Sequence, residues 1–399
     1  MKVLHLSTYN TKCGIADYLR YLLSEFEKID EYHDVYPINM DVQKKRKYNE
    51  AIEYYEEFIK KAQKYDIIHI QHEFGTFTGD YPIWKSFKLF NYILEGIKDK
   101  KVFVTFHSPP ILLLHNKISN KIFKSYSFVK YFQKDNNFIG LVHNNINLNQ
   151  YLQAGFSPKS IKQIFHPTPN LIKNQMINKE LSDAVTKKLN LDKDSKVLSI
   201  TGFINNSLEG RNILMRLLLT LLSSSGFSLK GQDIGIKILN QLPENYKFIL
   251  LGGKHPHGNS IYYDKIVEYI NENSLNDRVL ITGFYDEKDL ATYAELIDIF
   301  LAPYSNSFTA SSGAINVNIQ CRKPIIAFDI ESFKEINNEF EPLVLVKDEN
   351  SMKEKILEFE KDGSLNNYYI SQEELYLKNN SYEKLAKLQL EMYKSLMNH

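Results

Sequence analysis

The chain has 399 residues, of which 43% are hydrophobic, so it is long enough for two domains with separate cores. Its 49 lysines and arginines nearly balance its 48 aspartates and glutamates, which argues against a dedicated nucleic-acid-binding protein. Two distant cysteines, Cys13 and Cys321, give no disulfide framework, and the chain starts without a signal-peptide pattern, so we expect a cytoplasmic protein.

Short apolar runs, rich in β-branched and aromatic residues, recur along the chain between segments with helical spacing. Uninterrupted apolar runs are typical of parallel strands that helices cover on both faces. In the first half the predicted strands are Lys2–Ser7, Ile67–Gln71, Val102–His107, Phe138–His143 and Ile161–His166. In the second half they are Lys196–Gly202, Lys247–Gly253, Arg278–Phe284, Ile299–Pro303, Pro324–Phe328 and Leu343–Val346. The repeated rhythm predicts an α/β protein with two doubly wound parallel-sheet domains.

The predicted domains span residues 1–170 and 190–379, and a polar stretch after Pro167 joins them. A last helix within 380–399 carries apolar residues at helical spacing, and we expect it to cross back to the first domain. Ligands of doubly wound sheets lie beyond the carboxyl ends of the strands. We therefore expect the two sheets to face each other across a cleft that holds the site.

Two segments depart from this rhythm. The apolar centre of 208–229 is too short to span a bilayer and contains Arg216, so we expect a surface or interface helix there. In 117–134, lysines alternate with aromatic and aliphatic residues. This second segment is either a peripheral contact with an anionic membrane or an ordinary amphipathic helix whose lysines lie in water.

Candidate site residues in the first half follow predicted strands. Gly14 lies between a strand and a helix, where it either lets an anion approach the helix amides or relieves a tight turn. Four histidines end successive strands and are expected to converge on one sheet edge: His72, His107, His143 and His166. Their spacing is not that of metal ligands, so no metal ion is expected.

In the second half, the polar residues before a predicted helix favour phosphate binding. Ser311, Ser312 and Gly313 either cap that helix or hold a phosphate with amides and hydroxyls. Lys230 precedes another helix and would compensate the charge of a leaving diphosphate. Gly252 follows a strand, where glycine permits the close passage of a ligand.

Taken in order, these segments resemble glycosyltransferase family 4 and its relatives with the GT-B fold, over nearly the whole chain. QHEFGTFTG resembles a segment of one branch of that family, and TFHS resembles its strand-end motif. The similar segments of the second half are KVLSITGF, KGQDIGIKILNQLPENYKFILLGG, NDRVLITGFYDEKDL and CRKPIIAFD. SYEKLAKLQLEMYKSL is similar to the closing helix of the family.

The resemblance implies a role for each candidate residue. Gly14 would lie near the donor phosphates, His107 would position the transferred sugar and stabilise its developing charge, and Lys230 would bind the diphosphate. The residues implied for the base pocket are Gly283, Phe284, Tyr285 and Leu290. The residues implied for the donor's phosphate and ribose are Ser311, Ser312 and Gly313.

Two features depart from the family pattern. The family commonly has a Glu-x7-Glu pair, whereas Phe308–Asn318 contains no carboxylate and resembles the Ser-Gly helix start of some relatives. In addition, 208–229 separates the Gly202 strand end from Lys230. This segment either contributes to binding of acceptor or membrane, or displaces Lys230 and weakens donor binding.

The resemblance therefore implies a retaining hexosyltransferase that needs no metal or cofactor and takes part in polysaccharide biosynthesis for the bacterial cell envelope. Its expected partners are a nucleotide-sugar donor and a glycan or lipid-linked acceptor, with no nucleic acid. It would lie in the cytoplasm or at the inner face of the membrane. The alternatives are a sugar-nucleotide epimerase or a phosphorylase with the same fold, and a non-catalytic protein that binds a sugar or nucleotide.

Overall fold

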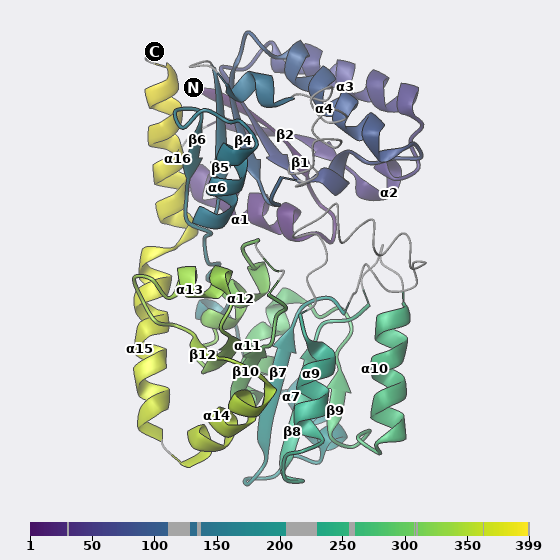
Figure 1. The fold of residues 1–399 in the computed structure, drawn as a ribbon, viewed down its shortest axis with the longest axis vertical. Helices are drawn as coiled ribbons and strands as arrows, with labels where there is room; N and C mark the ends of the chain where they lie inside the picture. The colour runs from purple at the N-terminus through teal and green to yellow at the C-terminus, as the bar shows by residue number, and fades with distance from the viewer. Residues whose placement is uncertain are drawn as a thin grey trace. The chain divides into compact units, whose positions relative to one another are not determined.

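The computed structural model describes residues 1–29, 32–110, 128–133, 137–204, 230–254, 260–306, 308, 310–361 and 363–397. The whole of 208–229 and most of 117–134 lie outside these residues, so what was expected of them stays a prediction. The chain divides into two compact units (Figure 1). The first unit is Met1–Pro167 with Tyr382–His399, and the second unit is Thr168–Ser381.

The first unit contains a six-stranded sheet in the order β2-β1-β3-β4-β5-β6, and every neighbouring pair is parallel. Its strands are β1 Lys2–Thr8, β2 Tyr32–Ile38, β3 Ile67–His72, β4 Lys101–Phe106, β5 Phe138–Val142 and β6 Ile161–Gln163. The sequence prediction missed β2. This strand lies at the sheet edge, where polar side chains and Pro37 are tolerated, so its sequence lacks an uninterrupted apolar run.

Helices cover both faces of the first sheet, and residues on the two faces of its strands belong to different core clusters. Leu4 and Val104 lie in the cluster that includes side chains of α3 (Tyr48–Ala62), α4 (Ile83–Gly96) and α6 (Asn145–Gln153). Val3 and Phe103 lie in the cluster formed with α1 (Gly14–Lys28) and α16 (Tyr382–Met397). Figure 1 shows α1 and α16 side by side, with the short α2 (Met40–Gln43) elsewhere in the unit. The last helix thus returns to the first unit, as predicted.

The second unit repeats the arrangement with a parallel sheet in the order β12-β11-β10-β7-β8-β9. Its strands are β7 Lys196–Thr201, β8 Tyr246–Leu251, β9 Val279–Ile281, β10 Ile299–Ala302, β11 Ile325–Phe328 and β12 Val344–Val346. On one face lie α9 (Gln232–Leu239), α10 (Ile261–Glu272) and α14 (Glu349–Lys361). On the other lie α7 (Lys179–Leu189), α11 (Leu290–Leu296), α12 (Gly313–Ile319) and α13 (Glu331–Ile336), and α15 (Gly363–Asn379) runs before the final helix. The prediction of two doubly wound parallel sheets is confirmed.

The described part of 117–134 is the short helix η4 (Phe128–Phe132). Its aromatic residues Phe128, Tyr131 and Phe132 are buried in the core of the first unit. Lys130 pairs with Glu95 at 3.3 Å. In this part of the segment, therefore, the aromatic side chains stabilise the fold and are not exposed to a membrane surface.

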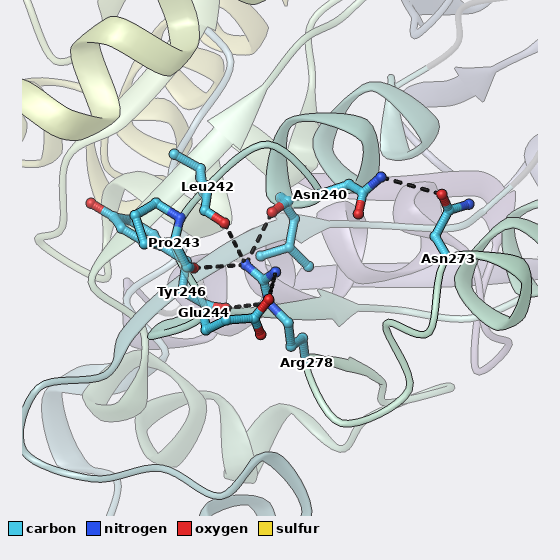
Figure 2. A network of polar contacts seen from close by, with 8 residues as sticks. Asn240, Leu242, Pro243, Glu244, Tyr246, Asn273 and Arg278 are labelled. Carbon is cyan, nitrogen blue, oxygen red and sulfur yellow. Dashed lines mark hydrogen bonds and ion pairs between the residues drawn. The ribbon is translucent and has the colours of Figure 1, made fainter.

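A buried arginine fixes the end of α9 that lies away from the strand carboxyl ends. Arg278 precedes β9, and its guanidinium donates hydrogen bonds to the backbone carbonyls of Leu239, Leu242, Pro243 and Tyr246 at 2.8–3.1 Å (Figure 2). A cation at the carboxyl end of a helix satisfies carbonyls that have no helical partner and interacts favourably with the helix dipole. This arrangement ties α9 to β8 and β9, so the opposite end of α9, next to Lys230, is held in a defined place.

Candidate functional site

In the second sheet, the order in which the chain adds strands reverses between β7 and β10. From β7 the chain continues to β8 and β9 on one side, then crosses to β10, β11 and β12 on the other. In doubly wound sheets, ligands bind at such a switch point, outside the carboxyl ends of the strands. The loops that follow β7 and β10 therefore form the candidate site of the second unit.

Lys230 contacts both of these loops. Its Nζ lies against Gly202, the residue after β7, so closely that a Cβ at Gly202 would collide with it. The same Nζ is 5.9 Å from the centre of the Tyr304 ring, in the loop after β10. In the described part of the chain no carboxylate forms an ion pair with Lys230. Its charge is therefore available to an anion at the switch point.

Two glycines of this site are explained by the fold itself. Gly231 precedes α9 with a φ of +71°, and a Cβ there would collide with the carbonyl of Pro303. Gly252 follows β8 with a φ of +149°, and a Cβ there would collide with the carbonyl of Gly202. Other residue types rarely adopt such φ values, so both positions require glycine whether or not a ligand is bound.

The predicted glycines Gly14, Gly283 and Gly313 differ from these two, because open space surrounds the place where a Cβ would project. Gly283 has a φ of +71°, which favours glycine. For Gly14 and Gly313, neither a left-handed backbone nor a close neighbour accounts for the residue. Their open surroundings are compatible with a ligand that approaches the backbone at the start of α1 and of α12.

Ser312 has the capping role that was one of its two predicted interpretations. Its Oγ accepts a hydrogen bond from the Ile315 amide at 3.3 Å and lies 3.1 Å from the hydroxyl of Tyr304. A hydroxyl has one donor and two acceptor positions, so Ser312 retains capacity for one more hydrogen bond. Ser311, next to it, is half-buried.

The residues predicted for the base pocket have different surroundings. Phe284 is 56% exposed, and its ring centre lies 6.1 Å from that of Phe203. Tyr285 packs edge-on against Tyr293, with ring centres 5.9 Å apart. Leu290 is fully buried in the core, so its side chain offers no surface to a base in this structure.

In the first unit, three of the predicted histidines come together at the ends of β4, β5 and β6. The ring centres of His107 and His143 are 5.4 Å apart, and those of His143 and His166 are 4.8 Å apart. Tyr18 of α1 packs edge-on against all three. His72 instead points into an aromatic core formed with Phe77 and Phe90. Among the described residues, no group of histidines, cysteines and carboxylates is arranged to hold a metal.

Burial keeps these imidazoles neutral. It lowers the pKa of His107 to about 3, with a further contribution from the neighbouring histidines. It lowers the pKa of His166 to about 4 and that of His143 well below its usual value. A neutral imidazole has one donor nitrogen and one acceptor nitrogen, and the partner of one nitrogen decides the role of the other.

A chain of buried hydrogen bonds orients His107. The hydroxyl of Tyr393, on α16, lies 2.5 Å from Nδ1 of His69. The Nε2 of His69 accepts hydrogen bonds from the Thr105 hydroxyl at 2.8 Å and from the Gln71 amide at 3.4 Å. The Oε1 of Gln71 then accepts from Nε2 of His107 at 2.8 Å. The C-terminal helix thus helps to fix the ring of a predicted site residue.

A carboxyl group also lies at the end of β3. Burial raises the pKa of Glu73, while the backbone amides of Gly75 and Thr76 and the charge of Lys44 act in the opposite direction. The Nζ of Lys44 donates to the Gly75 carbonyl at 3.1 Å. Glu73 therefore holds the QHEFG loop in its turn, which is a structural role.

Sequence reasoning missed three residues that position the predicted site residues at the carboxyl ends of the strands in the two sheets. Tyr304 joins Lys230 to Ser312, Gln71 orients His107, and Tyr18 packs against the histidines. Each position carries a weak signal, because each is a polar or aromatic residue next to a predicted site residue or at a strand end. Such residues are common, so the contacts themselves were needed to find them.

Comparisons with known proteins agree with this geometry. Residues 216–376 match the model of the family described as Glycosyl transferases group 1. No curated protein sequence matches the chain. HepE from Anabaena, solved with UDP and glucose, is similar with a TM-score of 0.70 and 15% identity, over 99% of this chain and 100% of that one.

Two further solved structures share the fold. Sucrose-phosphate synthase from Thermosynechococcus elongatus has a TM-score of 0.71 and 14% identity, with 100% of both chains covered. WaaG, a glycosyltransferase involved in lipopolysaccharide biosynthesis, has a TM-score of 0.62 and 9% identity, over 98% of this chain and 99% of that one. The chain thus has the fold of these structures in both units, and residues 216–376 are similar to the group 1 glycosyltransferases.

Proposed function

We propose that the protein transfers a hexose from a nucleotide-sugar donor to a glycan or lipid-linked acceptor, and that the donor carries uridine diphosphate. The observation that carries the proposal is Lys230 at the switch point of the second sheet, where no carboxylate in the described chain pairs with its ammonium group. HepE, which has the same fold, was solved with UDP and with UDP-glucose, and this supports the choice of nucleotide.

The proposed reaction breaks the bond between the anomeric carbon and the diphosphate oxygen. The acceptor oxygen bonds to the same carbon, and the acceptor proton leaves with the diphosphate. Lys230 stabilises the negative charge that grows on the diphosphate, which lowers the barrier because the diphosphate carries more negative charge in the transition state than in the bound donor. We further propose that anomeric configuration is retained, that no metal is needed, and that His107 positions the transferred sugar.

The setting is also part of the proposal. We expect the enzyme to act in the cytoplasm or at the inner face of the membrane, in assembly of a cell-envelope polysaccharide. WaaG, with the same fold, is described as taking part in lipopolysaccharide biosynthesis. Within the described ranges, none of the helices has the length and apolar character required to cross a bilayer.

The test combines binding and transfer. Isothermal titration should show UDP binding to the wild-type chain, and Lys230→Ala should lower the transfer rate by about 100- to 1,000-fold, the usual cost of removing one charge-stabilising donor. Lys237→Ala is the matched control, because Lys237 lies on α9 in a solvent-exposed pair with Asp233. Absence of nucleotide binding, or unchanged transfer by Lys230→Ala, would contradict the proposal.

A second candidate is a protein that binds a nucleotide sugar without transferring it. The absence of carboxylates from Phe308–Asn318 favours this candidate, because an anchor common in the family is missing. Incubation with a panel of donors separates the possibilities by their products. Transfer gives a new glycoside, an epimerase converts the donor without any acceptor, and a binding protein leaves the donor unchanged.

A further inference from the structure

His143 has a ring nitrogen for which the protein provides no partner. The residue follows β5, and only 7% of it is exposed. Its Nδ1 lies 3.2 Å from the backbone carbonyl of Phe165, whereas its buried Nε2 makes no hydrogen bond. A buried polar atom without a partner costs about 1–3 kcal/mol, so its persistence calls for an explanation.

The contacts of His143 define what this nitrogen can bind. A carbonyl oxygen only accepts, so Nδ1 must carry the proton and donate it to Phe165. Burial keeps the ring neutral by lowering its pKa. In a neutral ring with the proton on Nδ1, the Nε2 atom has a lone pair and no hydrogen. It can therefore accept a hydrogen bond from a hydroxyl but cannot donate one to a phosphate or carboxylate oxygen.

The neighbouring His107 presents the same chemistry. Its Nε2 donates to the Oε1 of Gln71, which leaves Nδ1 as an acceptor. The two rings are 5.4 Å apart, and Tyr18 packs against both. The hydrogen bonds and ring contacts of these two histidines in the described chain involve no lysine or arginine. In the described chain, this part of the sheet edge thus presents acceptors for hydroxyl groups, and no lysine or arginine is hydrogen-bonded to either ring.

We propose that His143 is a ligand-binding residue of the first unit, and that its Nε2 accepts a hydrogen bond from an uncharged sugar hydroxyl of the acceptor. The inference rests on the proposed function, because it assigns the acceptor to the first unit. It goes further by giving the chemical class of the group that is bound at this position. The sugar residue recognised there carries hydroxyls and neither a phosphate nor a carboxylate.

The first experiment uses the wild-type protein. Saturation-transfer NMR compares methyl glycosides of glucose, galactose, mannose and N-acetylglucosamine with glucuronic acid and glucose 6-phosphate, with and without UDP. At least one uncharged glycoside is expected to bind more tightly than both charged sugars. Binding of no uncharged glycoside, or tighter binding of a charged sugar, would overturn the proposal.

The second experiment observes the ring nitrogens directly. Long-range ¹H–¹⁵N correlation spectra of the wild-type protein should show the proton of His143 on Nδ1 and that of His107 on Nε2. Addition of the bound glycoside should shift the Nε2 resonance of His143. A proton on Nε2 of His143 in the free protein, or an Nε2 resonance that the glycoside does not move, would contradict the proposal without any need for a variant.

A pair of variants gives the third test. In His143→Asn the amide still donates to the Phe165 carbonyl, but nothing replaces Nε2, so glycoside binding should weaken about tenfold. His72→Asn is the control, since His72 points into the aromatic core, and its glycoside binding should not change. Unchanged glycoside binding by His143→Asn would refute the proposal.

Measurements of UDP binding separate a failure of this inference from a failure of the proposed function. UDP affinity should be the same in wild type and His143→Asn, while the acceptor KM should rise about tenfold. Loss of UDP binding in the wild type would defeat the proposed function. Normal UDP binding together with an unchanged acceptor KM in His143→Asn would defeat the role of His143 alone.

Discussion

The two sheets of this chain have the same parallel architecture, but their carboxyl edges differ in chemistry. The edge of the first sheet carries neutral imidazoles packed against aromatic rings, as His107, His143 and Tyr18 show. The edge of the second sheet carries glycines in close backbone contact and a lysine, as Gly252 and Lys230 show. One edge offers hydrogen-bond acceptors, and the other offers a positive charge.

Under the proposed function, this difference assigns the two edges to two parts of one transfer reaction. A parallel sheet places whatever follows its strands at one edge, so the residues after the strands decide the chemistry. Imidazole side chains fill space and present lone pairs. Glycines such as Gly252 let the loops of the second edge pack backbone against backbone, next to the lysine.

The largest expected difference between the two units is the stability that each loses on acidification. Burial lowers the pKa of both His69 and His72 to about 3, and all histidines of the described chain belong to the first unit. In the unfolded chain these histidines bind protons below their ordinary pKa of about 6.5, whereas in the folded chain they stay neutral down to about pH 3. The stability that the two groups contribute is therefore fully present above pH 6.5. This contribution is lost as pH falls towards 3. At pH 5 the loss should be about 2 kcal/mol for each of the two groups.

Hydrogen exchange read by mass spectrometry at pH 7 and pH 5 measures this effect for each unit. After correction for the intrinsic pH dependence of exchange, peptides of the β3–β4 region should lose protection at pH 5. Peptides of the β7–β8 region are the internal control and should keep theirs. Equal loss in the two units would break the comparison between them.

Alanine at glycine positions should distinguish structural glycines from those that face open space. Gly252→Ala places a Cβ against the Gly202 carbonyl at a φ of +149°, so the variant should lose about 1–3 kcal/mol of unfolding free energy. Gly14→Ala has open space and should unfold like the wild type, yet weaken donor binding if the donor approaches this backbone. Urea denaturation and UDP-glucose titration of both variants measure this difference. Equal stability of Gly252→Ala and wild type would contradict the close packing of the second edge.

A buried carboxyl in the second unit should respond to pH in the opposite sense to the histidines. Glu373 of α15 is fully buried, its oxygens make no hydrogen bond, and burial raises its pKa well above the ordinary value. Because the folded-state pKa is raised, the stability from this group is present at low pH and lost as pH rises through that pKa. Glu373→Gln removes the titration and should stabilise the chain by about 1 kcal/mol at pH 8.

Urea denaturation at pH 5 and pH 8 tests this smaller effect. Glu73→Gln is the comparison in the first unit. Burial raises the pKa of Glu73 as well, but the Gly75 and Thr76 amides and the charge of Lys44 oppose that shift, so neutralisation should stabilise the chain less than in Glu373→Gln. A Glu373→Gln variant that is less stable than wild type at pH 8 would mean that the carboxylate form is the one the fold needs.

The fold was predictable from sequence because buried parallel strands produce long apolar runs, as in β3 and β4, where nearly every residue is buried. The edge strand β2 was missed because one-sided pairing lets Tyr32–Ile38 keep polar residues and a proline. Gly14 and the histidines could be selected because they follow strands, and Lys230 because it precedes a predicted helix. The partner of Lys230, the ring orientation of His107 and the burial of Leu290 could not, since they depend on contacts between residues far apart in the chain.

The most direct test of the account measures two ligands on two variants. Isothermal titration of UDP and saturation-transfer NMR of the bound methyl glycoside are carried out on wild type, Lys230→Ala and His143→Asn. We predict that Lys230→Ala weakens UDP binding and leaves the glycoside unaffected, while His143→Asn does the reverse. If either variant weakens both ligands equally while its fold is intact, the two sheet edges do not divide recognition between diphosphate and sugar, and the account is wrong.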